Sequence, residues 1–210
     1  MSGVRGTEKR VPNRWGEGQL LRQEILDAAS RLLEETGSPD GISLRAIARE
    51  AGVTAPAIYK HFKDKTELMW TLLDTVYATM AERLRAARQS APAGDAWAGL
   101  RAVVDSYCDF ALDEPRRYEL LFHVGPLLPS PPQSIPHPMQ RLLDAWCEAV
   151  VPYLGEAEGI GVTDGRQLAK VLWSALHGQF GLWWNVSDLT DASDLVDMRE
   201  TLLLAVFGRR

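Results

Sequence analysis

The sequence ISLRAIAREAGVTAPAIYKHF, at residues 42–62, predicts two short helices joined by a tight turn. The apolar positions of residues 44–51 fall on one helical face, and residues 55–61 supply a second apolar face that can pack against it. Gly52 stands between them, where the turn favours a left-handed backbone that glycine adopts without steric cost. This pattern indicates a helix-turn-helix, in which the second helix enters the major groove of DNA.

The outward positions of the second helix combine small residues with polar and cationic ones. Small side chains let the helix backbone approach DNA closely, and polar side chains reach bases or phosphates. A proline in the first turn is compatible with this helix, because the N–H it lacks would have no helical partner there. The outward positions are Thr54, Ala55, Pro56, Ala57, Tyr59, Lys60 and His61.

The segments on either side of this hairpin are also predicted to be helical. Before it, an apolar stripe at residues 20–36 predicts a first helix, which Gly37 ends. After it, Asp64 and Glu67 have the spacing of a capping box, so a long helix is expected at residues 65–88.

Helical periodicity continues through the rest of the chain, and no pair of alternating strand-like segments occurs. We therefore expect an all-α protein. Residues 90–94, SAPAG, are the best candidate for a linker, and the proline-rich segment at 125–138 predicts an extended loop without helix. The later helices are expected near residues 95–113, 115–122, 139–151, 165–185 and 191–207.

The segment from residue 20 to residue 68 resembles the DNA-binding domain of the TetR (tetracycline-repressor) family. The resemblance rests on the pattern Ile47-Ala48-xx-Ala51-Gly52-Val53, followed by Ile58-Tyr59-xx-Phe62-xx-Lys65-xx-Leu68. It implies a three-helix DNA-binding domain that a long fourth helix joins to a helical domain for ligand binding and dimerisation. The expected bounds are 1–19 for a flexible basic arm, 20–66 for the DNA-binding domain and 67–210 for the second domain.

The resemblance also implies which residues contact DNA. Tyr59, His61 and Lys65 stand at positions where the family binds phosphate. Ser43 and Arg45 stand where the family's second helix touches the DNA backbone and sometimes a base. Phosphate binding at these positions agrees with the preference of anions for helix N-termini that carry hydroxyl or cationic side chains.

One departure from the family pattern concerns the recognition helix. Ala55-Pro56-Ala57 gives its first turn few hydrogen-bonding side chains. We therefore expect base reading to depend on methyl contacts, on Thr54 and Lys60, and on the N-terminal arm.

The last two helices are predicted to form a dimer interface. Residues 168–184, LAKVLWSALHGQFGLWW, are apolar nearly all round, which indicates burial on more than one side. Because a terminal helix pair this apolar would expose a large patch in a monomer, we expect a homodimer held by a four-helix bundle, as in TetR-like proteins. The candidate interface residues are Leu172, Leu176, Trp183, Leu195, Leu202 and Val206.

Bulky aromatic residues in the second domain are candidates for a ligand pocket, since such cavities are mostly apolar with a few polar groups. Trp173, His177 and Gly178 also resemble the signature of a regulatory-domain subtype named for Trp-His-Gly. For each of these side chains taken individually, an ordinary core position is the preferred interpretation. The candidates are Trp97, Tyr107, Phe110, Tyr118, Phe122, Trp146, Trp173, His177 and Phe180.

The charge distribution favours an anionic partner at the N-terminal part of the chain. The net charge of the 210 residues is −5, but residues 1–65 contain 11 Lys/Arg against 9 Asp/Glu, and the remainder contains 12 against 19. Four cations, Arg5, Lys9, Arg10 and Arg14, lie in the predicted arm.

Other classes of protein are not indicated. Cys108 and Cys147 alone cannot form a disulfide framework or a cysteine zinc site. No catalytic triad, phosphate-binding loop or dinucleotide motif occurs, so we expect no enzyme, no metal and no cofactor. No apolar segment approaches the ~18 residues that span a bilayer, and no secretory signal begins the sequence. We expect a cytoplasmic protein that does not bind membranes.

These observations predict a ligand-responsive, sequence-specific transcriptional regulator that binds double-stranded DNA. The favoured hypothesis is a homodimeric repressor that a small hydrophobic or aromatic effector releases from an inverted-repeat operator. An activator, or a DNA-binding regulator without a ligand, has the same sequence features. A sequestering protein that has lost DNA binding is a further alternative. The basic and hydroxyl-bearing side chains within residues 43–65 favour DNA binding over this alternative.

Overall fold

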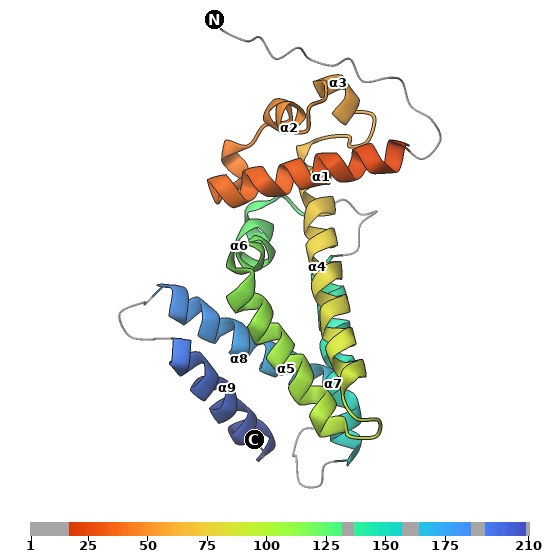
Figure 1. Cartoon of the computed structure of the whole chain (residues 1–210). Coiled ribbons are helices and arrows are strands. Elements are labelled where there is room, and N and C mark those ends of the chain that lie inside the picture. The colour runs from red at the N-terminus through yellow and green to blue at the C-terminus, as the bar shows by residue number, and fades with distance from the viewer. Residues whose placement is uncertain (1–16, 132–136, 157–163, 186–191, 209–210) are drawn as a thin grey trace, which may run out of the picture. The chain divides into compact units, whose positions relative to one another are not determined.

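The computed structural model describes residues 17–131, 137–156, 164–185 and 192–208. Every regular element in these residues is a helix, which confirms the all-α prediction. The chain divides into two compact units (Figure 1): a head, which ends at Leu72, and a body, which begins at Leu73. Residues 1–16 of the predicted basic arm, 1–19, lie outside the described residues, and its last three residues belong to the first helix.

The head contains the predicted helix-turn-helix. Helix α1 (Glu17–Thr36) is followed by a 3-10 turn, η1 (Pro39–Gly41), then by α2 (Leu44–Glu50) and α3 (Ala55–Ile58). Helix α2 packs against both α1 and α3. The inter-helix turn places Gly52 at φ +66°, the left-handed conformation that the sequence predicts. Helix α3 is shorter than the expected 55–61, because hydrogen-bonded turns replace regular helix after Ile58.

Buried apolar side chains from all these elements fix the angle between α2 and α3. Ile25 of α1, Ile47 of α2 and Ile58 of α3 are fully buried, and Phe62 completes the core. Burial of each such side chain contributes about 1.5–3 kcal/mol. The core therefore holds the opposite, polar sides of α2 and α3 in a fixed arrangement at the surface.

Helix α4 (Lys65–Ser90) begins in the head and continues into the body. Asp64 Oδ1 accepts a hydrogen bond from the Glu67 N–H at 2.9 Å, which confirms the predicted cap. Glu67 Oε2 accepts in return from the Lys63 N–H at 2.7 Å, one residue before the position that an ideal capping box uses.

The body is a helical assembly of α5 (Ala96–Asp113), α6 (Pro115–Glu119), a π-helical turn η2 (Leu120–Val124), η3 (Gly125–Leu127), α7 (Met139–Glu156), α8 (Gly165–Asn185) and α9 (Ala192–Phe207). Helix α7 packs against α5 and α8, and α9 packs against α8 (Figure 1).

Two segments of the body that contain proline differ from the sequence prediction. Helix α7 was expected to end at residue 151, but it continues through Pro152 to Glu156. Pro152 is exposed in the last turns, where the carbonyl that loses its helical partner can meet water. Gly125–Leu127, expected to lack helix, forms one 3-10 turn, in which a proline near the start costs no hydrogen bond.

Candidate nucleic-acid interface and effector region

The head presents a polar surface built by α2, α3 and the residues that flank them. We call it the outer face and define it by six exposed residues: Ser43, Arg45, Thr54, Pro56, Tyr59 and Lys60. Tyr59 is 58% exposed, although it is an aromatic residue directly beside the buried Ile58. The helical period explains this, because α3 turns Ile58 to the core and Tyr59 away from it.

The functional groups of the outer face have few intramolecular partners. Ser43 accepts a hydrogen bond from the Ala46 N–H at 3.1 Å and thereby caps α2. Thr54 occupies the equivalent position before α3, but its hydroxyl makes no capping bond. Arg45, Tyr59 and Lys60 have no hydrogen bond or ion pair with any described residue. These groups are therefore available to an external ligand.

The nearby carboxylates are already engaged, so they do not neutralise these cations. Glu50 pairs with Arg31 at 2.9 Å. Asp64 and Glu67 accept the backbone hydrogen bonds at the start of α4. The outer face is consequently cationic within a protein whose net charge is negative, which suits an anionic partner.

A hollow of about 430 Å³ lies between α2 and α3 on this side of the head. The sequence does not indicate this hollow, because its depth depends on how the two helices cross. Its wall includes Leu44, a residue that the sequence assigned only to the helical core face. The lining residues are Leu44, Arg45, Ala55, Pro56 and Tyr59.

The other predicted DNA contacts are less accessible. Ala55, Ala57 and His61 are half-buried. Lys65 is also half-buried, and its ammonium donates a hydrogen bond to the carbonyl of Pro39. Lys65 therefore ties the start of α4 to η1, whatever it contacts outside the protein.

The body contains a chain of hydrogen bonds that joins four of the predicted pocket residues. Trp173 Nε1 donates to the Tyr107 hydroxyl at 3.1 Å, and the hydroxyls of Tyr107 and Tyr118 lie 2.9 Å apart. The Tyr118 hydroxyl lies 2.6 Å from His177 Nδ1. Because an indole N–H can only donate, a single direction from Trp173 to His177 gives each donor an acceptor. We call these four residues the polar chain.

Burial governs the chemistry of this chain. Desolvation raises the pKa of Tyr107 and that of Tyr118 above the ordinary value of 10.0. Both phenols therefore remain neutral and keep their protons for hydrogen bonding over the physiological pH range.

Aromatic side chains surround the polar chain. Phe122 stacks near Tyr118 and His177, with ring centroids at 4.8 Å and 4.0 Å, and Phe180 lies 5.5 Å from Tyr118. The ring centroids of Trp146 and Tyr107 lie 5.4 Å apart. Trp146 is completely buried, yet its Nε1–H has no acceptor among the described residues. Proteins seldom leave a buried N–H unpaired, so this group marks a place for an acceptor.

Two predicted pocket residues lie outside this cluster. Trp97 packs instead against Tyr153 and Phe207, at centroid distances of 5.4 Å and 5.8 Å. Phe110 lies under the guanidinium of Arg83, which is 5.6 Å from its ring centre.

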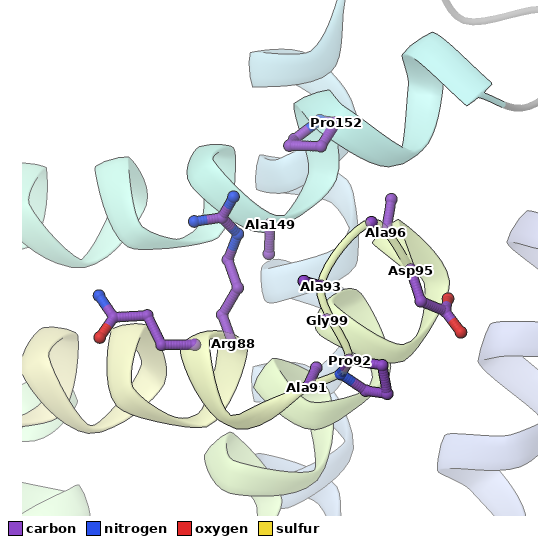
Figure 2. A pocket seen from close by; sticks show the side chains of 11 residues that line it. Arg88, Ala91, Pro92, Ala93, Asp95, Ala96, Gly99, Ala149 and Pro152 are labelled. Atoms are coloured by element: carbon purple, nitrogen blue, oxygen red, sulfur yellow. The ribbon is translucent and has the colours of Figure 1, made fainter.

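A hollow of about 350 Å³ occurs elsewhere in the body, where α4 ends and α5 begins (Figure 2). Figure 2 shows the Arg88 side chain extending from α4 toward α7, which contributes Ala149 and Pro152 to the wall. None of the predicted pocket residues lines this hollow.

The predicted interface residues divide between core and surface. Leu172 and Leu176 of α8 are completely buried inside the body, so within this chain they are core residues. Trp183, Leu202 and Val206 are half-buried, and the side chain of Leu195 lies outside the described residues. The exposed apolar residues of α8 and α9, which the sequence did not single out, are Val171 (48% exposed), Leu182 (58%) and Leu204 (41%).

The described residues also bear on metal binding and on membrane crossing. No group of His, Cys, Asp and Glu side chains there has the arrangement of a metal site. No described helix combines the length and apolarity that crossing a membrane requires.

Comparisons with known proteins match both units. Residues 25–70 match the family model of bacterial regulatory proteins of the tetR family, and residues 100–198 match a model described as tetracyclin repressor-like, C-terminal domain. An HTH-type transcriptional regulator of Mycobacterium tuberculosis is 29% identical over 231 residues, which cover 95% of this chain and 97% of that protein.

Two solved structures are similar to this chain over most of its length. A TetR-family transcriptional regulator from Streptomyces coelicolor is 26% identical, with a TM-score of 0.64, covering 90% of this chain and 98% of that chain. A protein of unknown function from Rhodococcus sp. RHA1 is 26% identical, with a TM-score of 0.70, covering 89% of this chain and 95% of that chain.

Proposed function

Because this chain belongs to the TetR family of DNA-binding transcriptional regulators, we propose that it is a ligand-responsive repressor. In this proposal a homodimer binds an inverted-repeat operator through the outer faces of its two heads. A small hydrophobic or aromatic effector binds in the body and releases the operator.

The observation that carries the DNA-binding proposal is the set of unpartnered groups on the outer face. Arg45, Tyr59 and Lys60 are exposed and have no hydrogen bond or ion pair with a described residue, while the neighbouring carboxylates are engaged. Cations of this kind bind DNA phosphates and release counterions. The remaining predicted contacts, Ala57, His61 and Lys65, would lie at the edge of the interface.

The polar chain and Trp146 support an effector site in the body. A ligand among these aromatic rings would gain mainly from apolar contact. The Nε1–H of Trp146, which has no acceptor among the described residues, adds one hydrogen bond to the ligand. We therefore propose an effector that is largely apolar and carries a hydrogen-bond acceptor such as a carbonyl or ether oxygen.

Helix α4 is the proposed connection between effector and DNA. It is continuous from Lys65, which is tied to Pro39 in the head, to Ser90 in the body. An effector that favours one arrangement of the body helices would change the population of head positions that fit the operator.

The exposed apolar residues Val171, Leu182 and Leu204 are the proposed centre of the dimer interface. A second copy of α8 and α9 would cover them, and Leu202 and Val206 would lie at the same contact. We further propose that the body belongs to the Trp-His-Gly subtype, since Trp173 and His177 both take part in the polar chain.

The direct test is selection of bound sites from random duplex DNA with the purified full-length protein. We expect an inverted repeat with half-site centres about 34–36 Å apart, because a two-fold dimer presents two copies of one reading head. Enrichment of asymmetric sites would contradict the dimer model. An unenriched pool would contradict sequence-specific DNA binding.

The effector proposal is tested with a library of apolar and aromatic compounds, scored for a higher melting temperature and for release of the selected operator. Trp146→Phe should weaken the response to an active compound about fivefold, the range of one lost hydrogen bond. Trp97→Phe, in the separate aromatic cluster, is the matched control and should leave it unchanged. A library without any active compound would contradict the sensor role.

A further inference from the structure

The hollow of the body, where α4 ends and α5 begins, combines one cation with a largely apolar wall. Arg88 stands in the last turn of α4, is half-buried and has no hydrogen bond or ion pair with a described residue. Pro92, Ala149 and Pro152 are among the apolar residues of the wall, and Gln89 adds a side-chain amide. Small-molecule sites commonly have this composition, an apolar cavity with a few polar groups that fix the orientation of the ligand.

The carboxylates nearest to Arg88 in the fold are already engaged. Glu148 of α7 pairs with Arg85, whose guanidinium donates to both carboxylate oxygens at 3.0 Å. Asp95, which also lines the hollow, accepts a hydrogen bond from the Ala98 N–H at 2.9 Å and caps α5. Figure 2 shows the Asp95 carboxylate directed away from Arg88. Within the described residues, the guanidinium of Arg88 therefore has no counter-charge.

The aliphatic part of Arg88 lies close over the start of α5. At Gly99, an added Cβ would be 3.6 Å from Arg88 Cγ, so this position leaves the stem room to pass. Beyond it, the side chain extends toward α7, where Ala149 also lines the hollow (Figure 2). A cation in the last turn favours the negative end of the helix dipole in any case, but that interaction does not require the side chain to extend toward another helix.

We propose that this hollow binds a small monocarboxylate with an apolar body, whose carboxylate pairs with Arg88. A guanidinium presents parallel N–H donors that match the two oxygens of a carboxylate. At the ~30 Å³ that one water-sized group occupies in a liquid, a hollow of about 350 Å³ has room for roughly a dozen non-hydrogen atoms. No residue of the polar chain lines this hollow, so it is a second small-molecule site, separate from the proposed effector region.

The experiment is isothermal titration calorimetry of the full-length protein with 4-phenylbutyrate, a carboxylate of about this size. The neutral 4-phenylbutyramide has the same shape and is the comparison compound. The carboxylate should bind about tenfold more tightly than the amide, the ratio that one hydrogen bond between charged groups supplies. Inorganic phosphate brings charge without an apolar body and should bind at least about tenfold more weakly than 4-phenylbutyrate.

Variants then assign the carboxylate preference to Arg88. In Arg88→Gln the two compounds should bind equally well, whereas Arg88→Lys keeps the charge without the planar donor group and should retain part of the preference. Lys170→Gln, at an exposed cation of α8 outside the hollow, is the matched control and should retain the wild-type ratio. Trp146→Phe, beside the polar chain, should retain it too. A partly unfolded variant would bind both compounds less and leave their ratio unchanged.

The outcomes concern this site alone. A carboxylate preference that Arg88→Gln removes and Lys170→Gln retains supports it. The site is refuted if neither compound binds, if wild-type protein binds both equally, or if the preference persists in Arg88→Gln. Phosphate that binds as tightly as 4-phenylbutyrate would also refute it, because the apolar wall would then contribute nothing. Arg88 is assigned no contact with DNA, so the regulator function stands or fails separately, in the selection of operator sites.

Discussion

Tyr59 and Tyr118 carry the same hydroxyl group in opposite settings. Tyr59 projects from the head into solvent, 58% exposed and without a partner among the described residues. Tyr118 is buried in the body, where its hydroxyl lies between the hydroxyl of Tyr107 and the imidazole of His177. The first group is available for a ligand, whereas the second is part of the internal structure.

The arginines of the two units differ in the same way. In the body, Arg101 pairs with Glu200 at 2.6 Å and Arg199 pairs with Asp105 at 2.9 Å, which fasten α5 to α9. On the head, Arg45 is exposed and has no such partner among the described residues, although Arg31 pairs with Glu50. The difference teaches that residue type alone does not identify a DNA-binding surface. Exposure together with the lack of an internal partner identifies it, because Arg88 of the body also lacks a partner among the described residues but is half-buried.

The largest effect is expected from Leu204→Glu. In a single chain this position is 41% exposed, so the charge should be tolerated, but a dimer would bury two unpaired charges at a cost of several kcal/mol. Sedimentation equilibrium at micromolar concentration should show a monomer. Leu127→Glu, at an exposed body position outside α8 and α9, is the control and should stay dimeric. A dimeric Leu204→Glu protein would place the interface elsewhere.

The second largest effect is expected when one positive charge is reversed, in the head or in the body. Lys60→Glu and Arg88→Glu both change the net charge by two, and neither native side chain has a partner among the described residues. Lys60→Glu should lower operator affinity on the order of tenfold per protomer, because it replaces an exposed cation of the outer face with a charge that the DNA phosphates repel. Arg88→Glu lies in the body and should change affinity little. Equal losses would mean that only net charge matters.

The tyrosine pair gives a smaller effect. Tyr118→Phe removes a hydroxyl that bonds the buried Tyr107 and the half-buried His177, so the free energy of unfolding should fall by about 1–3 kcal/mol in urea titrations. Tyr59→Phe removes an exposed hydroxyl and should leave that free energy within about 0.5 kcal/mol of the wild type. Its operator affinity should fall instead. The account fails if the two substitutions have the same profile.

The smallest effect concerns alkaline pH. Burial raises the pKa of the Cys108 thiol from 9.0 to about 12, so the folded protein keeps this proton where the unfolded chain releases it. The associated stability is fully present below about pH 9 and is lost as the pH rises toward 12. The urea midpoint should decline between about pH 8.5 and pH 10.5, because the unfolded chain releases the thiol proton over this range. The decline should be smaller in Cys108→Ala. Cys147→Ala, at a half-buried thiol, should retain most of the decline.

Local features of the fold could be predicted from the sequence. The bounds of α8, Gly165–Asn185, agree with the periodicity, and the cap at Asp64 agrees with its spacing from Glu67. Both depend on residues within one or two turns of each other. The continuation of α7 past Pro152 could not be predicted, because it depends on solvent access to a single carbonyl.

Contacts between distant segments could not be predicted from the sequence. Trp173 and Tyr107 are 66 residues apart, and no spacing rule relates them, although each was separately a pocket candidate. The faces of α8 were also ambiguous, because a helix that is apolar all round does not show which side is core. Leu172 is therefore core and Val171 surface, a distinction that only the packing of α7 and α8 provides. The hollow between α2 and α3 arises in the same way.

The salt dependence of operator affinity tests the central claim most directly, that the unpartnered cations of the head contact DNA. Log affinity should fall linearly with log salt concentration, and one lost phosphate contact lowers the slope by about 1. Arg45→Ala should therefore reduce the slope by about 2 in a dimer, whereas Arg88→Ala should retain the wild-type slope. A wild-type slope in Arg45→Ala, or an equal reduction in Arg88→Ala, would contradict the account.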